Sequence, residues 1–282
     1  MVDPKHLLTS LQMAEFVHNG FLRFDELIPR DVCDELYAYI DSHPIERAVM
    51  PCPLSEAWQP DHPCYKAYVA NPAMQGIIHS LVGPNARYDH HHPHRTAPHN
   101  ATQQGLHQDA EYDTRFDSFD VQISIFPQDT PIELGGTRFL PGSHFRRVYV
   151  QEVSRYQNVR GMVQCVCKAG TVVVWHHNLW HGAQPNTGDI NRYMVKLRIN
   201  PTVRQQLLFD TRDLADPAIH GWMNKSHAWW GVEARLEMIN KIRLWRALTG
   251  QPDWDSAMWL TRIENNPTTL YHRDQYSPLR PD

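Results

Sequence analysis

The 282-residue sequence has no long run of apolar residues, and its mean hydropathy is −0.53. A membrane-spanning helix needs about 20 consecutive apolar residues, so none is expected. The opening MVDPKHLLTSLQ lacks a basic segment followed by an apolar one, so we expect no signal peptide. Lys and Arg number 27 against 31 Asp and Glu, which excludes the basic excess of a nucleic-acid binder.

Cysteine is also scarce and unpatterned. The five residues are odd in number and contain no CxxC pair: Cys33, Cys52, Cys64, Cys165 and Cys167. Neither a disulfide framework nor a zinc site has this pattern. We therefore expect reduced thiols in a cytoplasmic protein.

The first part of the chain, residues 1–85, has a mostly helical pattern. Thr9 and Gln12 form a capping box, and the helix that they open should end at Asn19-Gly20. FLRF (21–24) predicts a short strand. Two apolar sets at helical spacing predict further helices: Val32, Leu36, Tyr39 and Ile40, and then Met74, Ile77, Ile78 and Leu81.

The character of the sequence changes over residues 86–203. Short segments rich in β-branched, aromatic or alternating residues, such as DVQISIF and GTVVVWH, are separated by Gly, Pro, Asn and Asp. This pattern is typical of an antiparallel barrel or sandwich. Residues 204–282 are Trp-rich and return to a helical pattern, with a helix over 232–250 that ends at Gly250. With no repeat or linker, we expect one domain over 1–282, mainly β with flanking helices.

A candidate metal site begins at GLHQDAEYD, where His107 and Asp109 are separated by one residue. Side chains two apart on an extended segment point to the same side. GTVVVWHHNLWHG supplies a third ligand, His181, while His176 and His177 on the same segment are rivals for that role. Two imidazoles and one carboxylate leave three coordination positions open, as in non-heme Fe(II) oxygenases.

A buried cation for a dicarboxylate is expected on the strand NRYMVKLRI. Tyr193, Val195, Leu197 and Ile199 share one face, which should pack on the helices. The opposite face, directed into the barrel, carries Arg192, Met194, Lys196 and Arg198. The guanidinium of Arg192 can pair bidentately with a carboxylate. DVQISIF alternates in the same way, so Gln122 and Ser124 should face the same interior and line a substrate pocket.

The motifs HQD, ELGGTRFLPGSH, GTVVVWHHNLWHG and the segment from Asn186 to Arg192 resemble the phytanoyl-CoA dioxygenase family of Fe(II)/2-oxoglutarate oxygenases. The likeness covers roughly residues 10–200 and implies a double-stranded β-helix, the cupin-type jelly roll. It implies that His107, Asp109 and His181 hold iron and that Arg192 binds the C5 carboxylate of 2-oxoglutarate. Three other residues are candidates for contact with this cosubstrate: Gln104, His94 and Thr137.

The function implied is oxidation, above all hydroxylation, of an unactivated carbon of a small organic molecule with Fe(II), 2-oxoglutarate and O₂, giving succinate and CO₂. Retention of Asp109 argues against halogenation, while desaturation, cyclisation and epimerisation stay open. The alternatives are a cupin-like metal-dependent hydrolase or isomerase and a non-catalytic small-molecule-binding protein. Arg192 counts against both, because neither needs a clamp for a dicarboxylate.

Other features leave two interpretations open. The run DHHHPHRTAPH (89–99) is more typical of a strand and loop than of a second metal site, although His92 is a candidate for the pocket wall. Tyr112 and Asp113 form either a substrate loop or an ordinary turn. Lys196 and Arg198 favour an anionic substrate. The C-terminal tryptophans, Trp222, Trp229, Trp230 and Trp245, suit core packing or a homodimer contact.

Overall fold

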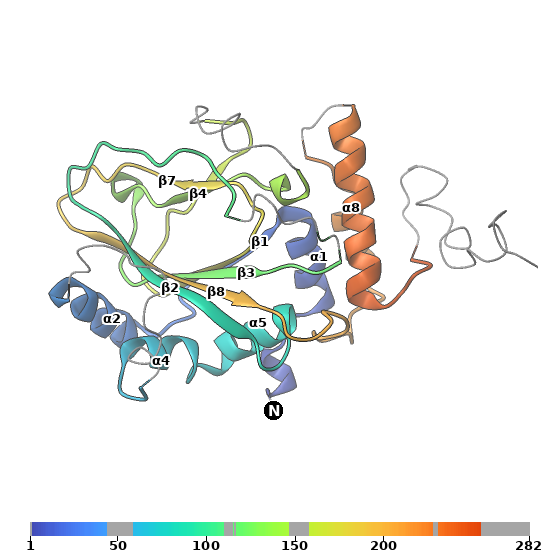
Figure 1. Ribbon diagram of the computed structural model, residues 1–282, viewed down its shortest axis with the longest axis horizontal. Coiled ribbons are helices and arrows are strands. Elements are labelled where there is room, and N and C mark those ends of the chain that lie inside the picture. The colour runs from blue at the N-terminus through green and yellow to red at the C-terminus, as the bar shows by residue number, and fades with distance from the viewer. Residues whose placement is uncertain are drawn as a thin grey trace, which may run out of the picture.

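Five antiparallel strands form the larger of two facing sheets in the computed structural model of the chain (Figure 1). Their order is β1 (Phe21–Phe24), β6 (Thr171–His176), β3 (Val121–Phe126), β8 (Arg192–Asn200) and β2 (Arg87–Thr96). The smaller sheet has the order β5 (Val163–Gln164), β4 (Thr137–Phe139) and β7 (His181–Ala183). The jelly-roll class predicted from the sequence is confirmed.

The structure describes residues 2–43, 59–109, 115, 117–146, 158–227 and 231–254, apart from the side chains of Asp89, His90 and His92. Within these ranges the α-helices are α1 (Ser10–Asn19), α2 (Arg30–Ser42), α4 (Pro63–Tyr68), α5 (Pro72–Val82), α7 (Pro217–Asn224) and α8 (Val232–Thr249). Three short 3₁₀ segments are η1 (Pro4–His6), η2 (Ile132–Leu134) and η3 (Ser143–Phe145). Tyr112 and Asp113 lie outside the described residues.

The helix ends follow the predicted signals. In α1 the Thr9 hydroxyl accepts from the Gln12 N–H at 3.2 Å, and the Gln12 amide oxygen accepts from the Thr9 N–H at 3.0 Å. The helix ends at Gly20, whose φ of 81° is a conformation that favours glycine. α8 likewise ends at Gly250, with φ of 65°. Both predicted boundaries are confirmed.

The main hydrophobic core lies between the large sheet and the helices. Figure 1 shows α2, α4 and α5 on the face of this sheet opposite β4 and β7. β3 and β8 contribute the alternating apolar residues predicted to face away from the barrel interior: Val121, Ile123, Ile125, Tyr193, Val195, Leu197 and Ile199. Val172 and Val174 of β6 join them in the same core. Each such fully buried aliphatic side chain stabilises the fold by about 1.5–3 kcal/mol. The alternation therefore fixes which side chains enter the barrel.

The barrel interior is divided between an apolar cluster and polar groups. The cluster contains Phe126, Phe139, Val173, Trp175 and Met194 from both sheets, together with Leu179 from the segment between β6 and β7. Gln122, Ser124 and Lys196 are buried on the inward faces of β3 and β8, where Ser124 lies opposite Lys196 in the register. The prediction that polar side chains enter the barrel is confirmed.

Two strands differ in length from their sequence patterns. MVQCVCK predicts a strand, but only Val163–Gln164 is paired as one, because Cys165 and Cys167 bond separately to Thr137 and Thr130. In the other direction, β2 continues through Pro93 to Thr96. Proline is tolerated there because β2 is at the edge of the sheet and needs pairing on only one side.

The C-terminal helices pack on α1 rather than on the sheet. Trp245 of α8 is fully buried in the main core, as core packing predicts. Trp222 of α7 lies under the Lys225 ammonium, 3.9 Å from the ring centre. Trp229 and Trp230 lie outside the described residues, and a homodimer contact through this region stays a prediction.

Candidate metal centre

The structure brings His107, Asp109 and His181 together, with one ligand atom of each within 4.8 Å of the others. His107 Nε2 lies 3.4 Å from Asp109 Oδ1, and His181 Nε2 lies 3.7 Å from Asp109 Oδ2. A two-residue β-bridge sets this geometry, because the His107 N–H donates to the His181 carbonyl at 3.0 Å and the His181 N–H donates to the His107 carbonyl at 2.9 Å. Residues far apart in the sequence thus meet across one backbone pair.

Backbone carbonyls orient both imidazoles. Nδ1 of His107 lies 2.9 Å from the Gly105 oxygen, and Nδ1 of His181 lies 2.9 Å from the Leu179 oxygen. A ring that donates from Nδ1 has its lone pair on Nε2, and in both residues Nε2 is the atom directed at Asp109. Burial lowers the pKa of His181 to about 4, so this ring is neutral at pH 7. The tautomers suit metal ligation.

Asp109 is held as a carboxylate. Burial alone would raise its pKa, but the nearby His181, Lys196 and His107 outweigh that effect and hold the pKa well below its usual range. Gln122 Nε2 donates to Oδ2 at 2.5 Å, and Lys196 Nζ donates to the same oxygen at 3.1 Å. Both residues are candidates for the pocket wall by their sequence pattern; in the structure their polar ends contact Asp109.

Gln108, between the two ligands, points the other way. Its amide nitrogen donates to the carbonyls of Arg146, at 2.9 Å, and Asn178, at 2.8 Å. Arg146 in turn forms an ion pair with Glu233 of α8 at 2.9 Å. These hydrogen bonds hold the segment that carries His107 and Asp109 from the side opposite the two ligands.

Arg192 is only 2% exposed, and no ion pair joins it to an acidic side chain of the residues that the structure describes. Its Nη2 donates to the hydroxyl of Thr96. The side-chain amide of Asn186 donates to the carbonyl of Thr96 at 3.1 Å and holds this residue in place. Nε and Nη1 are buried without a hydrogen-bond partner among the described residues. Burial lowers the pKa of Arg192 to about 10, so it still carries its charge at pH 7. A buried cation with two open donors fits a carboxylate ligand.

The other cosubstrate candidates differ in their surroundings. Thr137 is buried and its hydroxyl donates to Met194 Sδ at 3.2 Å, while His94 pairs with Met194 in the β2–β8 register. Both therefore lie beside Met194, which is two residues from Arg192 along β8. Gln104 is exposed, and its amide oxygen accepts from the Ala183 N–H at 3.1 Å. Their contact with 2-oxoglutarate stays a prediction.

The rival ligands and the remaining pocket candidates also have defined places. The rival His176 accepts the Asn178 N–H at Nδ1, and the rival His177 is buried 3.9 Å from Asp120 Oδ2, so neither joins the three-residue cluster. Ser124 is buried. The backbone of His92 pairs with Lys196 in the sheet.

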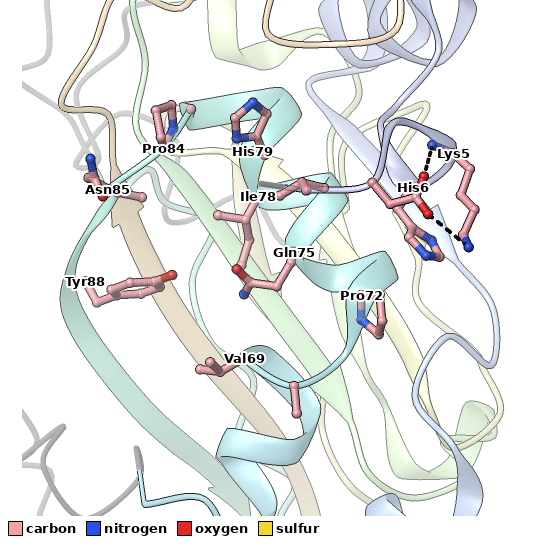
Figure 2. A pocket seen from close by; sticks show the side chains of 15 residues that line it. Lys5, His6, Val69, Pro72, Gln75, Ile78, His79, Pro84, Asn85 and Tyr88 are labelled. Carbon is pink, nitrogen blue, oxygen red and sulfur yellow. Dashed lines mark hydrogen bonds and ion pairs between the residues drawn. The ribbon is translucent and has the colours of Figure 1, made fainter.

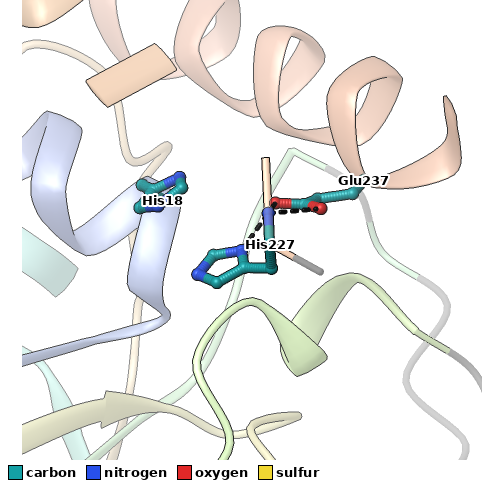
Figure 3. Close-up of side chains that lie close together, drawn as sticks. All are labelled: His18, His227 and Glu237. Atoms are coloured by element: carbon teal, nitrogen blue, oxygen red, sulfur yellow. Dashed lines mark hydrogen bonds and ion pairs between the residues drawn. The ribbon is translucent and has the colours of Figure 1, made fainter. Parts of the chain in front are cut away.

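A second cluster of possible ligands, which the sequence analysis missed, joins α1 to α8 (Figure 3). His18, His227 and Glu237 have ligand atoms within 4.8 Å of one another. His227 Nδ1 lies 2.6 Å from Glu237 Oε1. The fully buried Lys241 ammonium lies 3.2 Å from His18 Nδ1 and 3.8 Å from Glu237 Oε1. Because the ammonium already supplies the positive charge of this cluster, the cluster is complete without a metal. Its sequence signal was the pair of Glu237 and Lys241, four residues apart in a helix with a broad apolar face.

A large open cavity of about 1060 Å³ lies on the outer side of the molecule, between the N-terminal segment, α5 and β2 (Figure 2). Its wall includes Lys5, Gln75, His79 and Tyr88. His107, Asp109 and His181 do not line this cavity. Its size therefore does not identify it as the candidate metal site.

Comparisons with known proteins identify the family of the chain. The model of the phytanoyl-CoA dioxygenase (PhyH) family matches residues 16–194, more than half of the chain. The chain therefore belongs to this family of 2-oxoglutarate-dependent oxygenases, which use Fe(II), 2-oxoglutarate and O₂. No curated protein sequence matches the chain.

Solved structures share the fold at low sequence identity. HygX from Streptomyces hygroscopicus, with nickel and 2-oxoglutarate bound, is 16% identical with a TM-score of 0.56, over 73% of this chain and 93% of HygX. The 2-oxoglutarate-dependent carbocyclase SnoK from nogalamycin biosynthesis is 19% identical with a TM-score of 0.55, over 71% and 87%. The epimerase SnoN from nogalamycin biosynthesis is 15% identical with a TM-score of 0.54, over 71% and 84%.

In the part of the chain that the structure describes, no helix combines the length and apolar character needed to cross a membrane.

Proposed function

We propose that this protein uses Fe(II), 2-oxoglutarate and O₂ to oxidise, and most simply hydroxylate, an unactivated carbon of a small organic molecule, with succinate and CO₂ as coproducts. The observation that carries the proposal is the buried Arg192 guanidinium with two open donors, in the same barrel as three converged ligands. A hydrolase or isomerase on this fold, or a binding protein with a vestigial site, has no use for such a clamp.

The side chains divide the work as follows. His107, Asp109 and His181 hold the iron, which supplies the oxidising chemistry when bound. Arg192 binds the C5 carboxylate of 2-oxoglutarate. It lies four residues from Lys196 along β8, or about 13 Å of strand, and Lys196 reaches Asp109. A five-carbon dicarboxylate together with the Arg192 side chain suits that span. The apolar cluster of Phe139, Trp175 and its neighbours excludes water from this space.

An anionic substrate is part of the proposal. The charges of Fe(II) and Arg192 balance those of Asp109 and 2-oxoglutarate. Lys196 and Arg198 lie on the inward face of β8, opposite Ser124 and Gln122 of β3. Their positive charge on the same face as Arg192 favours a substrate that carries a carboxylate or a similar group. A cytoplasmic location is proposed as well, because the four described cysteines are all free thiols.

The first test is the visible charge-transfer band that forms when Fe(II) and 2-oxoglutarate are added to the purified protein without oxygen. The wild type should show the band, and Asp109→Ala should lose it together with metal affinity. Metal bound without any band would refute the oxygenase proposal and favour the hydrolase. Oxygen should then turn 2-oxoglutarate into succinate, and candidate small acids should increase that rate more than their neutral amides. Equal effects would refute the anionic substrate.

A further inference from the structure

The two oxygens of Asp109 have different surroundings. Oδ2 accepts hydrogen bonds from Gln122 Nε2 at 2.5 Å and from Lys196 Nζ at 3.1 Å. Oδ1 lies 3.4 Å from His107 Nε2, and Oδ2 lies 3.7 Å from His181 Nε2, so each oxygen has an imidazole nitrogen nearby. The difference is in the hydrogen bonds, because among the described residues both donors bind Oδ2. They occupy the lone pairs of Oδ2 and leave those of Oδ1 available to a metal.

This division matters because coordination positions are limited. An octahedral iron with three protein ligands and a chelating 2-oxoglutarate has one position left for O₂. If Asp109 bound through both oxygens, it would occupy that last position. A carboxylate can be mono- or bidentate, so something must decide between the two modes.

Resting on the function proposed above, we infer that Lys196 is a positioning residue. With Gln122 it holds Oδ2, so that Asp109 ligates the metal through Oδ1 alone. The ammonium also draws charge from the carboxylate and makes it a weaker donor to the metal.

Lys196 has the stronger of the two roles. A hydrogen bond from a charged donor to a carboxylate is roughly twice as strong as one between neutral groups. The Lys196 backbone is fixed in the middle of β8, between Ser124 on one side and His92 on the other, and the side chain is 10% exposed. Burying a lysine in this way is expensive unless it is paired, and Asp109 is the acid with which it pairs.

The experiment compares three variants of the full chain under anaerobic conditions. Lys196→Met removes the donor, Lys196→Arg restores a charged donor, and Arg198→Met removes one positive charge two residues along the same face of β8. Each is titrated with Co(II) alone, to measure metal binding, and then with Fe(II) and 2-oxoglutarate. The readout is the energy of the visible charge-transfer band. Thermal melting without metal shows whether each variant is folded.

The inference predicts that Lys196→Met binds metal but shifts the band to lower energy, because the carboxylate then donates more charge to iron. Lys196→Arg should return the band toward the wild-type position, and Arg198→Met should not move it. An unshifted band in Lys196→Met, or an equal shift in Arg198→Met, would overturn the inference. If Lys196→Met does not fold, Lys196→Gln carries the same test, with a smaller shift. No band in the wild type would instead refute the proposed function.

Discussion

The affinity for 2-oxoglutarate should depend on the two open donors of Arg192. Arg192→Met removes Nε and Nη1, which are buried and unpaired among the described residues. A hydrogen bond to a charged group contributes about 1.5–3 kcal/mol, so the loss of two costs ~3–6 kcal/mol. Since each 1.4 kcal/mol is tenfold in affinity, the dissociation constant should rise by at least about 100-fold. Arg192→Lys keeps the charge but not the planar pair of donors, and we expect an intermediate loss.

The same substitution should have the opposite effect on the stability of the unliganded protein. A buried cation with unsatisfied donors is a cost to the fold, so Arg192→Met should raise the free energy of unfolding by about 1–2 kcal/mol. The assay is calorimetric titration with 2-oxoglutarate in the presence of Mn(II), together with urea denaturation of the metal-free variants. Wild-type affinity in Arg192→Met would refute the reasoning. Weakened binding accompanied by a destabilised fold would refute it too, because the loss would then reflect damage to the barrel.

Three further predictions concern stability. Lys241→Met leaves the fully buried Glu237 carboxylate without its cation, so urea denaturation should show a loss of about 3 kcal/mol, and Lys241→Met with Glu237→Gln should recover most of it. Burial and the nearby Lys241 lower the pKa of His18 to about 2, whereas the unfolded residue titrates near 6.5. The unfolded state therefore binds more protons, and stability should fall by ~1.4 kcal/mol per pH unit as pH drops below 6.5. His18→Asn should reduce this slope, and a slope equal to that of the wild type would contradict the assignment. Gly136→Ala, at φ 77°, places a Cβ 2.3 Å from the Cys165 carbonyl oxygen and should cost at least ~2 kcal/mol by the same assay. Gly161→Ala, at φ 91° with no atom within 4 Å of that Cβ, should cost only about 1 kcal/mol.

Much of the barrel could be predicted because its signals are local. The period-two alternation of β3 and β8 depends on which face is buried, and it correctly separates Gln122 and Lys196 from Ile123 and Leu197. The capping box of α1 and the glycine at its end are equally local. The convergence of His107, Asp109 and His181 followed from motif order, and the structure supplies the β-bridge that brings them together.

The unpredicted parts depend on contacts between distant segments. Periodicity places Lys196 inside the barrel. Its contact with Asp109 depends on the path of the irregular segment that carries Asp109, and that segment has no periodic pattern from which its path could be predicted. The cluster of His18, His227 and Glu237 joins three segments, and one of its histidines lies in a loop. Cys165 and Cys167 bond to Thr137 and Thr130, two residues separated along the chain by the η2 segment, and a local sequence pattern does not reveal such a partner. Each of these features depends on tertiary contacts.

Because Gln108 is anchored, the stability of the folded protein should depend on the metal concentration. Because the segment between the ligands is already fixed to the carbonyls of Arg146 and Asn178, the metal meets ligands whose conformational entropy was lost when the chain folded. An unfolded chain, in which Asp109 and His181 are far apart, has no comparable site. Metal should therefore bind the native state alone and stabilise it by about 4 kcal/mol at a thousand times the dissociation constant. Any melting temperature of this protein is meaningful only together with the metal concentration at which it was measured.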